Sequence, residues 1–171
     1  MCSQPFLLRQ SGGFTLIELM ITITVLSILL LIGSALTRSW VDRSQINSGI
    51  STLKNTVAQA KTAALRNTNN QPLNHPAVSV CWNALSHTLS VLRLAQNSSD
   101  LCNVASADHT VLFSSSLAQG IVIRQDQTAF QCLAFNAAGV LIAPAGSSCV
   151  NSSSLSLKVE KNNENAEFTL F

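Results

Sequence analysis

Charged residues are scarce in this sequence: Asp, Glu, Lys and Arg make up 11% of its 171 residues. The formal net charge is only +2. A protein that holds nucleic acid through the phosphate backbone needs an excess of basic side chains. The composition therefore gives no indication of a nucleic-acid partner.

Signatures of catalysis and of metal binding are also missing. The sequence has no Gly-x-Ser-x-Gly motif and no glycine-rich phosphate loop. Its few acidic residues suggest no catalytic carboxylate pair. His75, His87 and His109 are far apart, and there is no Cys-x-x-Cys pair to suggest zinc. We therefore expect no catalytic residue, no metal and no cofactor.

Proline is absent between Phe14 and Pro72. Because proline interrupts helices, its absence allows one helix to run through this whole stretch. The weakest point is Gly33, since glycine inside a helix costs about 1 kcal/mol relative to alanine.

The most prominent feature of the sequence is an uncharged apolar stretch, residues 19–36. As a helix, its roughly 18 residues would rise about 27 Å, close to the thickness of a bilayer's hydrocarbon core. Glu18 lies at its edge, where an ionisable group is costly unless it has a partner. Gly12 and Gly13 precede it and are flexible enough to enter a protease cleft.

The segment Gly13-Phe14-Thr15-Leu16-Ile17-Glu18 resembles the processing site of type IV pilins and type II secretion pseudopilins. The resemblance implies that a prepilin peptidase removes a leader, residues 1–13, by cutting between Gly13 and Phe14, and methylates the Phe14 amine. It implies that Glu18 neutralises the N-terminal amine of a neighbouring subunit during assembly. Residues 14–36 would form the transmembrane half of the N-terminal helix in the bacterial inner membrane, with the C-terminal domain in the periplasm.

Two other interpretations of the apolar stretch remain open. It could be a secretory signal cleaved near Gly33, although it is longer than usual and only Arg9 precedes it. It could also be a plain membrane anchor, which leaves Glu18 unexplained. The orientation rests on the motif, because Arg9 is opposed by Arg38 and Arg43 beyond the stretch.

Residues 37–70 are expected to form the amphipathic half of the same helix. Apolar and small residues recur there at steps of four and three: Ile46, Ile50, Leu53, Val57, Ala60 and Ala64. Gly49 and the alanines favour close packing on a sheet, with a coiled-coil seam as the alternative. Turn-forming residues after Arg66 predict the end of the helix.

Residues 71–171 contain short β patterns between polar turns and no helical pattern. The expected strands are 77–82, 88–95, 110–115, 120–125, 129–135, 140–143, 154–161 and 167–171, the last two joined across 162–165. The sequence thus predicts an α+β fold: a long N-terminal helix packed on a C-terminal antiparallel β-sandwich.

Four cysteines lie beyond the helix, Cys81, Cys102, Cys132 and Cys149, whereas Cys2 lies in the expected leader. Four cysteines allow three connectivities, and a periplasmic location favours disulfides. Sequence proximity favours Cys81–Cys102 and Cys132–Cys149, each of which would staple a long loop. Free thiols in a cytosolic domain are the alternative.

A helix ending at 61–66, followed by Val-Ser-Val-Cys at 78–81, resembles the GspH/FimT family of minor pilins and pseudopilins, which includes FimU. The resemblance implies a structural subunit that helps initiate or cap a type IV pilus or a type II secretion pseudopilus. Its partners would be other minor and major pilins or pseudopilins. The sequence does not separate the two machines, and we favour the pilus slightly.

Some FimT-type relatives bind incoming DNA through an arginine-bearing C-terminal segment. Here residues 158–167 hold two lysines against three glutamates, and no arginine follows Arg124. Phosphate binding gains from arginine and needs positive charge. A DNA-binding minor pilin for natural transformation is therefore the less favoured alternative.

Overall fold

A computed structural model describes residues 13–96, 98, 100–150 and 155–170, with the backbone alone at 34–36. The described residues form one long helix, α1 (Leu16–Arg66), and nine strands. The chain divides into two compact units, Met1–Arg38 and Ser39–Phe171, and α1 contributes to both. α1 is continuous from Leu16 to Arg66, as the absence of proline from this stretch led us to expect.

The end of α1 is fixed by an asparagine cap. Asn67 takes a left-handed conformation, with φ of 38°, which asparagine tolerates better than most residues. Its backbone N–H donates to the Ala64 carbonyl, and its side chain bonds both the N–H and the carbonyl of Gln71. The helix therefore ends at Arg66, as the turn-forming residues predicted, and residues 67–70 of the expected amphipathic half lie in the turn that follows.

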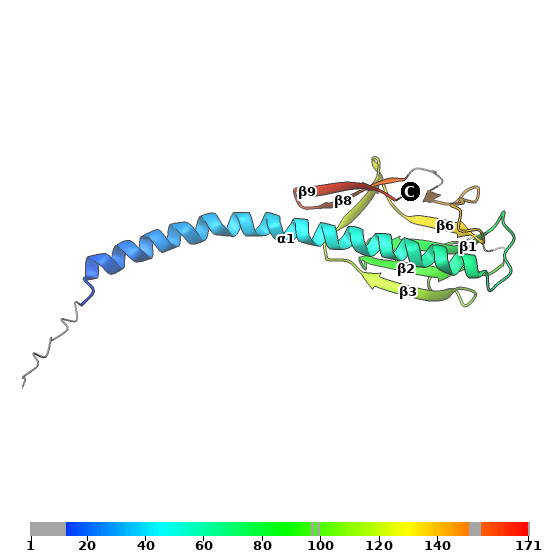
Figure 1. The fold of residues 1–171 in the computed structure, drawn as a ribbon, viewed down its shortest axis with the longest axis horizontal. Coiled ribbons are helices and arrows are strands. Elements are labelled where there is room, and N and C mark those ends of the chain that lie inside the picture. The colour runs from blue at the N-terminus through cyan, green and yellow to red at the C-terminus, as the bar shows by residue number, and fades with distance from the viewer. Residues whose placement is uncertain (1–12, 97, 99, 151–154, 171) are drawn as a thin grey trace, which may run out of the picture. The chain divides into compact units, whose positions relative to one another are not determined.

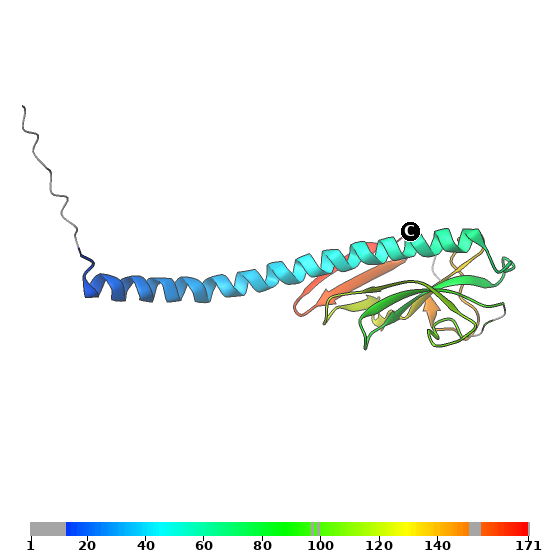
Figure 2. The ribbon, with the colours of Figure 1, turned by 90° about the horizontal axis from the view of Figure 1, so that it is seen from below.

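The second unit contains two sheets that lie along its part of α1 (Figures 1 and 2). The five-stranded sheet has the order β3-β2-β1-β6-β7, with bounds β1 (Pro76–Asn83), β2 (Thr88–Arg93), β3 (Thr110–Ser116), β6 (Cys132–Asn136) and β7 (Cys149–Val150). The four-stranded sheet has the order β5-β4-β8-β9, with bounds β4 (Val122–Gln125), β5 (Thr128–Ala129), β8 (Ser156–Lys161) and β9 (Glu164–Thr169). The predicted α+β arrangement is confirmed.

The main core joins α1 to the inner faces of both sheets. The predicted helical stripe faces it: Ile46, Leu53, Val57, Ala60 and Ala64 are buried, and Ile50 is partly buried. Gly49 is buried as well, and a Cβ there would lie 3.3 Å from Cδ1 of Ile121, just before β4. Such close approach identifies the stripe as a helix-on-sheet contact rather than a coiled-coil seam.

A second, smaller core covers the outer face of the five-stranded sheet. Leu92, Leu94, Leu101 and Ala134 meet there with Cys81, Cys132 and Cys149. The centre of the sheet is therefore buried on both faces, which explains why β1 is buried at six consecutive positions instead of at alternate ones.

The single strand predicted at 129–135 was wrong, because the chain changes sheets there. The Phe130 N–H donates to the Ile123 carbonyl at 3.0 Å, in line with the four-stranded sheet. One residue later, the Gln131 carbonyl accepts from the Trp82 N–H at 2.8 Å and belongs to the five-stranded sheet. β5 and β6 are thus separate strands in different sheets.

Other departures from the prediction are smaller. Residues 140–143 form only an isolated bridge, Phe135 to Leu141, rather than a strand. β7 was not predicted, and it pairs with β6 in parallel, so the sandwich is not wholly antiparallel. The last hairpin turns through two residues, with Asn162 at φ 52°, so β9 begins at Glu164 and not at 167. Position 154 of the predicted strand 154–161 and position 171 of the predicted strand 167–171 lie outside the described residues.

Candidate functional site

The predicted processing junction lies immediately before α1. Gly13, Phe14 and Thr15 are non-helical, and the Phe14 side chain is 81% exposed. Leader residues 1–12 lie outside the described part of the chain. The Gly13–Phe14 peptide bond is therefore not held in helix, as entry into a protease cleft requires.

Thr15 and Glu18 cap the start of α1 reciprocally. The Thr15 carbonyl accepts the Leu19 N–H at 3.2 Å, and the Thr15 hydroxyl accepts the Glu18 N–H at 3.3 Å. The same hydroxyl donates to Oε2 of Glu18 at 3.4 Å. This is a variant of the Thr-x-x-Glu capping box. The sequence contains the Thr-x-x-Glu signal, although the prediction for Glu18 was only a pairing with an amine.

Glu18 has no cationic side chain near it in sequence. Its carboxylate sits in the first helical turn, where the positive end of the helix dipole favours it. Residues 13–37 contain no Lys, Arg or His. No side chain of residues 13–37 can therefore neutralise Glu18, and the amine that cleavage before Phe14 would create is a candidate partner.

The first half of α1 exposes almost nothing but hydrocarbon. Its large apolar side chains from Leu16 to Ile32 are all more than half exposed. The hydroxyls of Thr22, Thr24 and Ser27 donate to carbonyls of their own helix, so they need no outside partner. α1 contains a stretch that is long and apolar enough to cross a membrane. This surface fits an anchor in the inner membrane.

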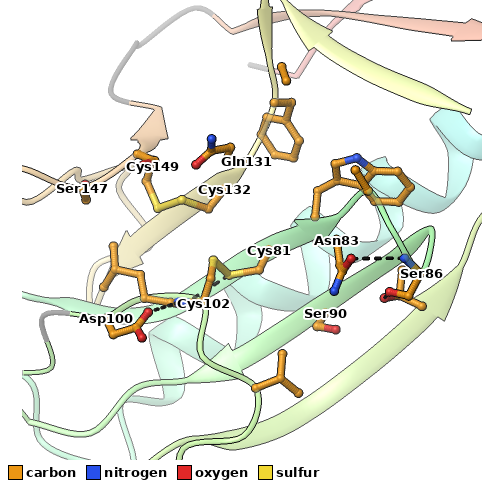
Figure 3. A pocket seen from close by; sticks show the side chains of 18 of the residues that line it. Cys81, Asn83, Ser86, Ser90, Asp100, Cys102, Gln131, Cys132, Ser147 and Cys149 are labelled. Atoms are coloured by element: carbon orange, nitrogen blue, oxygen red, sulfur yellow. Dashed lines mark hydrogen bonds between the residues drawn. A yellow bond between two sulfur atoms is a disulfide. The ribbon is translucent and has the colours of Figure 1, made fainter.

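The four cysteines form two neighbouring disulfides, Cys81–Cys102 and Cys132–Cys149, the pairs that sequence proximity favoured. The first ties β1 to the loop before β3, and the second ties β6 to β7. Cys81 and Cys132 face each other across β1 and β6, so the two bridges lie side by side on the outer face of the sheet (Figure 3).

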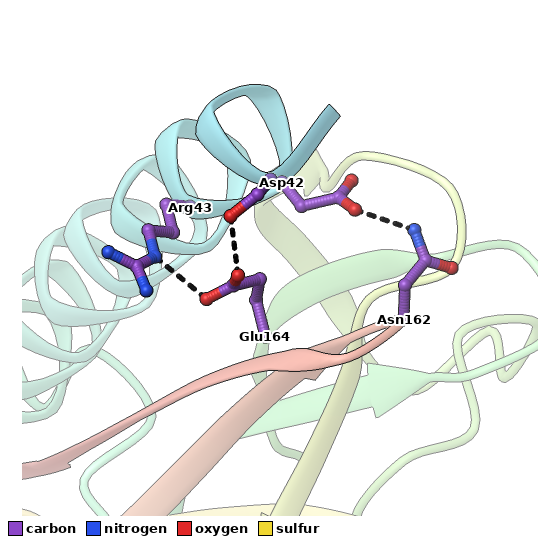
Figure 4. Close-up of polar contacts among 5 residues, drawn as sticks. Asp42, Arg43, Asn162 and Glu164 are labelled. Atoms are coloured by element: carbon purple, nitrogen blue, oxygen red, sulfur yellow. Dashed lines mark hydrogen bonds and ion pairs between the residues drawn. The ribbon is translucent and has the colours of Figure 1, made fainter. Parts of the chain in front are cut away.

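A polar cluster joins the β8–β9 hairpin to the first turns of α1 in the second unit (Figure 4). Glu164 accepts hydrogen bonds from the Ser39 hydroxyl at 2.5 Å and from Arg43 Nε at 2.7 Å. Next to it, Asn162 Nδ2 donates to Asp42 at 2.8 Å. The hydrogen bond from Ser39, and then the one from Arg43, lower the pKa of Glu164.

The basic side chains around β8 are already engaged. Glu160 pairs with Lys158 at 2.8 Å and with Arg124 at 3.0 Å, and the hydrogen bond from Lys158 is the largest cause of its lowered pKa. Lys161 donates to Gln45 and to the Gln119 carbonyl. Each of these cations thus has an acceptor within the domain.

The structure brings together no metal ligands and no catalytic constellation within the residues that it describes. His75 and His87 lie in turns, and His109 ends the loop before β3. The first half of α1 offers one acid, Glu18, on an otherwise apolar and exposed surface.

Comparison with known proteins addresses this N-terminal region. The sequence profile of the family described as the prokaryotic N-terminal methylation motif matches residues 8–34. No curated protein and no solved structure matches the chain. The match supports a type IV pilin-like or pseudopilin protein, processed by a prepilin peptidase and assembled with other pilins.

Proposed function

We propose that this chain is a minor pilin or pseudopilin, a structural subunit that helps initiate or cap a type IV pilus or a type II secretion pseudopilus. The observation that carries the proposal is Glu18, the one ionisable residue within 14–36, at the start of an exposed apolar helix directly behind Gly13–Phe14. A GspH/FimT-like order of elements, a long helix followed by β1, supports the choice of a minor subunit.

The proposed mechanism begins with the precursor in the inner membrane and its domain in the periplasm. Cleavage between Gly13 and Phe14 frees an amine, which is then methylated. Glu18 attracts the amine of an adjacent subunit in a medium of low dielectric, where a charge pair is strong and an unpaired carboxylate is penalised. The pairing sets the axial register as the helices bundle, and the domains form the outside of the filament.

The mass of the protein isolated from cells tests the processing step. We expect a chain that begins at Phe14 and carries one added methyl group, and an untrimmed chain in cells that lack the prepilin peptidase. A protein that still begins at Met1, or that begins near Leu36, would contradict the proposal.

Glu18→Gln tests the pairing step, because the amide keeps the size of the side chain and removes its charge. We expect normal membrane insertion but loss of the subunit from sheared filaments, measured by immunoblotting. Ser27→Ala, in the same apolar segment, is the matched control and should be incorporated normally. Normal incorporation of Glu18→Gln would refute the role in register.

We favour a pilus slightly over a secretion pseudopilus, and neighbouring genes would separate them. Direct DNA binding is the weaker proposal, because Arg124, Lys158 and Lys161 already have acceptors. Steeply salt-dependent, micromolar binding of DNA by the full-length protein would reverse that ranking. A shortened domain beginning at Ser44 would be a poor reagent, since it loses the contacts of Ser39 and Arg43 with Glu164.

A further inference from the structure

The outer face of the five-stranded sheet holds a groove of about 940 Å³ (Figure 3). Its lining includes both disulfides, the turn between β1 and β2, the loop that carries Cys102, and the loop that leads into β7 at Cys149. The volume lies at the upper end of the range typical of small-ligand sites. Neither the processing junction nor Glu18 takes part in it.

The lining carries many hydrogen-bonding groups but almost no charge. Hydroxyls and amides are contributed by Asn83, Ser86, Ser90, Ser114, Gln131 and Ser147, and the single carboxylate is Asp100. Among the described lining residues there is no Lys, Arg or His. Phosphate, sulfate and carboxylate ligands are normally held by such cations. The groove therefore suits a neutral ligand that offers many hydrogen-bonding groups.

Apolar surface is interleaved with these polar groups. Trp82 and Val104 line the groove and keep part of their surface exposed, whereas the lining residues Leu101 and Phe130 are buried. A ligand that matches both kinds of surface has hydroxyls at its edges and C–H groups on its faces. Sugars have this construction, whereas a lipid chain would leave the hydroxyls and amides of the lining without partners.

The walls are held in place before any ligand arrives. Oδ1 of Asn83 accepts the N–H groups of Leu85 and Ser86 at 3.0 and 3.1 Å, which fixes the β1–β2 turn. Oδ1 of Asp100 accepts the Cys102 N–H at 3.2 Å, and the Ser147 hydroxyl donates to the Pro144 carbonyl at 2.8 Å. The segments that contain Asp100 and Ser147 are each also anchored by a nearby disulfide. Preorganised walls reduce the entropy lost on binding.

We propose that this groove binds a neutral oligosaccharide. Gln131 is a principal contact, because its exposed amide lies beside the Cys132–Cys149 bridge and has no hydrogen-bond partner among the described residues (Figure 3). Its amide has one oxygen that accepts hydrogen bonds and two N–H groups that donate them, a set that matches adjacent sugar hydroxyls. This site is independent of the proposed function, since it uses no residue of the first half of α1.

Saturation-transfer NMR on the full-length protein in lipid nanodiscs tests the proposal. The probes are maltotriose, cellotriose and tri-N-acetylchitotriose, with a sulfated trisaccharide and a Ser/Gly/Asn peptide of similar size as comparisons. We expect transfer to at least one neutral trisaccharide and none to the sulfated one. Gln131→Ala should weaken that binding roughly tenfold, the effect of losing one or two hydrogen bonds.

Gln127→Ala is the matched control, since Gln127 is an exposed glutamine in the β4–β5 turn that does not line the groove. It should bind as the unmodified protein does. The proposal is overturned if no neutral trisaccharide receives saturation, or if Gln131→Ala binds with unchanged affinity. It is overturned equally if the sulfated sugar or the peptide binds better than every neutral trisaccharide.

Discussion

Gly49 marks the closest contact of α1 with the four-stranded sheet. A Cβ at this position would lie 3.3 Å from Ile121 Cδ1 and 4.0 Å from Val159 Cγ1, both in the main core. We predict that Gly49→Leu destabilises the domain by about 1–3 kcal/mol, the usual effect of overfilling a packed core. Thermal unfolding followed by circular dichroism measures the change.

Gly33→Leu is the matched control for that substitution. A Cβ at Gly33 would meet nothing within 4 Å, so the added side chain has room. The unfolding transition of the domain should therefore stay where it is. An equal loss of stability in both variants would show that Gly49 has no special place in the packing.

Glu164 makes the stability of the domain depend on pH. The Ser39 hydroxyl and then Arg43 favour the carboxylate, so the pKa of Glu164 is lowered from its ordinary value of 4.5. The contribution is fully present above that value and is lost as the pH falls through the lower pKa of the folded state. Glu160 acts in the same direction through Lys158 and Arg124. We predict that the melting temperature falls below about pH 4.5.

Glu164→Gln distinguishes the contribution of Glu164 to the acid dependence from that of Glu160. The variant should be less stable at neutral pH, and its melting temperature should fall less steeply in acid than that of the unmodified protein. Glu167→Gln, on the exposed side of the same strand, should keep the full acid dependence. Identical pH profiles for Glu164→Gln and the unmodified protein would contradict this role for the cluster at Ser39 and Arg43.

At the scale of elements, the disulfides hold loops that have little regular structure. Cys81 and Cys102 are 21 residues apart, and the bridge ties the loop before β3 to the centre of the sheet. Closing a loop of that size typically stabilises a protein by about 2–4 kcal/mol. We predict that replacing both Cys81 and Cys102 by serine lowers the melting temperature. A reductant should lower the melting temperature of the unmodified protein at least as much, and no shift with reductant would contradict the prediction.

The elements that could be predicted from sequence are those set by nearby residues. The stripe from Ile46 to Ala64 repeats with helical spacing, and β8 alternates apolar and polar residues, so each was recognisable by itself. The change of sheet at Phe130 was not recognisable, because residues 129–135 have the pattern of one continuous strand. Only the tertiary structure shows that they belong to two sheets. The parallel pair of β6 and β7 depends on a loop whose path no local pattern encodes.

The same distinction applies to the candidate sites. Residues 13–18 form a continuous motif, so the junction and Glu18 could be recognised directly, and the Thr15 cap could have been recognised with them. The contact of Ser39 with Glu164 spans 125 residues. The groove likewise gathers side chains from β1, β2, β3 and several loops. Contacts of this kind arise only from tertiary packing.

At the scale of the whole molecule, the proposed topology fixes the compartment of the domain. We predict that alkaline phosphatase fused after Phe171 is active in cells, since that enzyme matures only outside the cytoplasm. Cys81, Cys102, Cys132 and Cys149 should then resist alkylation unless a reductant is added. An inactive fusion with four alkylated cysteines would place the domain in the cytoplasm. A fusion that lacks residues 14–36 is the control and should be inactive.

The facing positions of Cys81 and Cys132 have a consequence for oxidative folding. During folding, Cys81 and Cys132 can each form a disulfide with its native partner or with the other. If β1 and β6 pair before the native disulfides form, a non-native Cys81–Cys132 disulfide can form and leave Cys102 and Cys149 without a partner. The yield of folded, exported protein should fall when a disulfide isomerase is absent. Overproduction should increase the fraction of chains that carry the non-native Cys81–Cys132 disulfide.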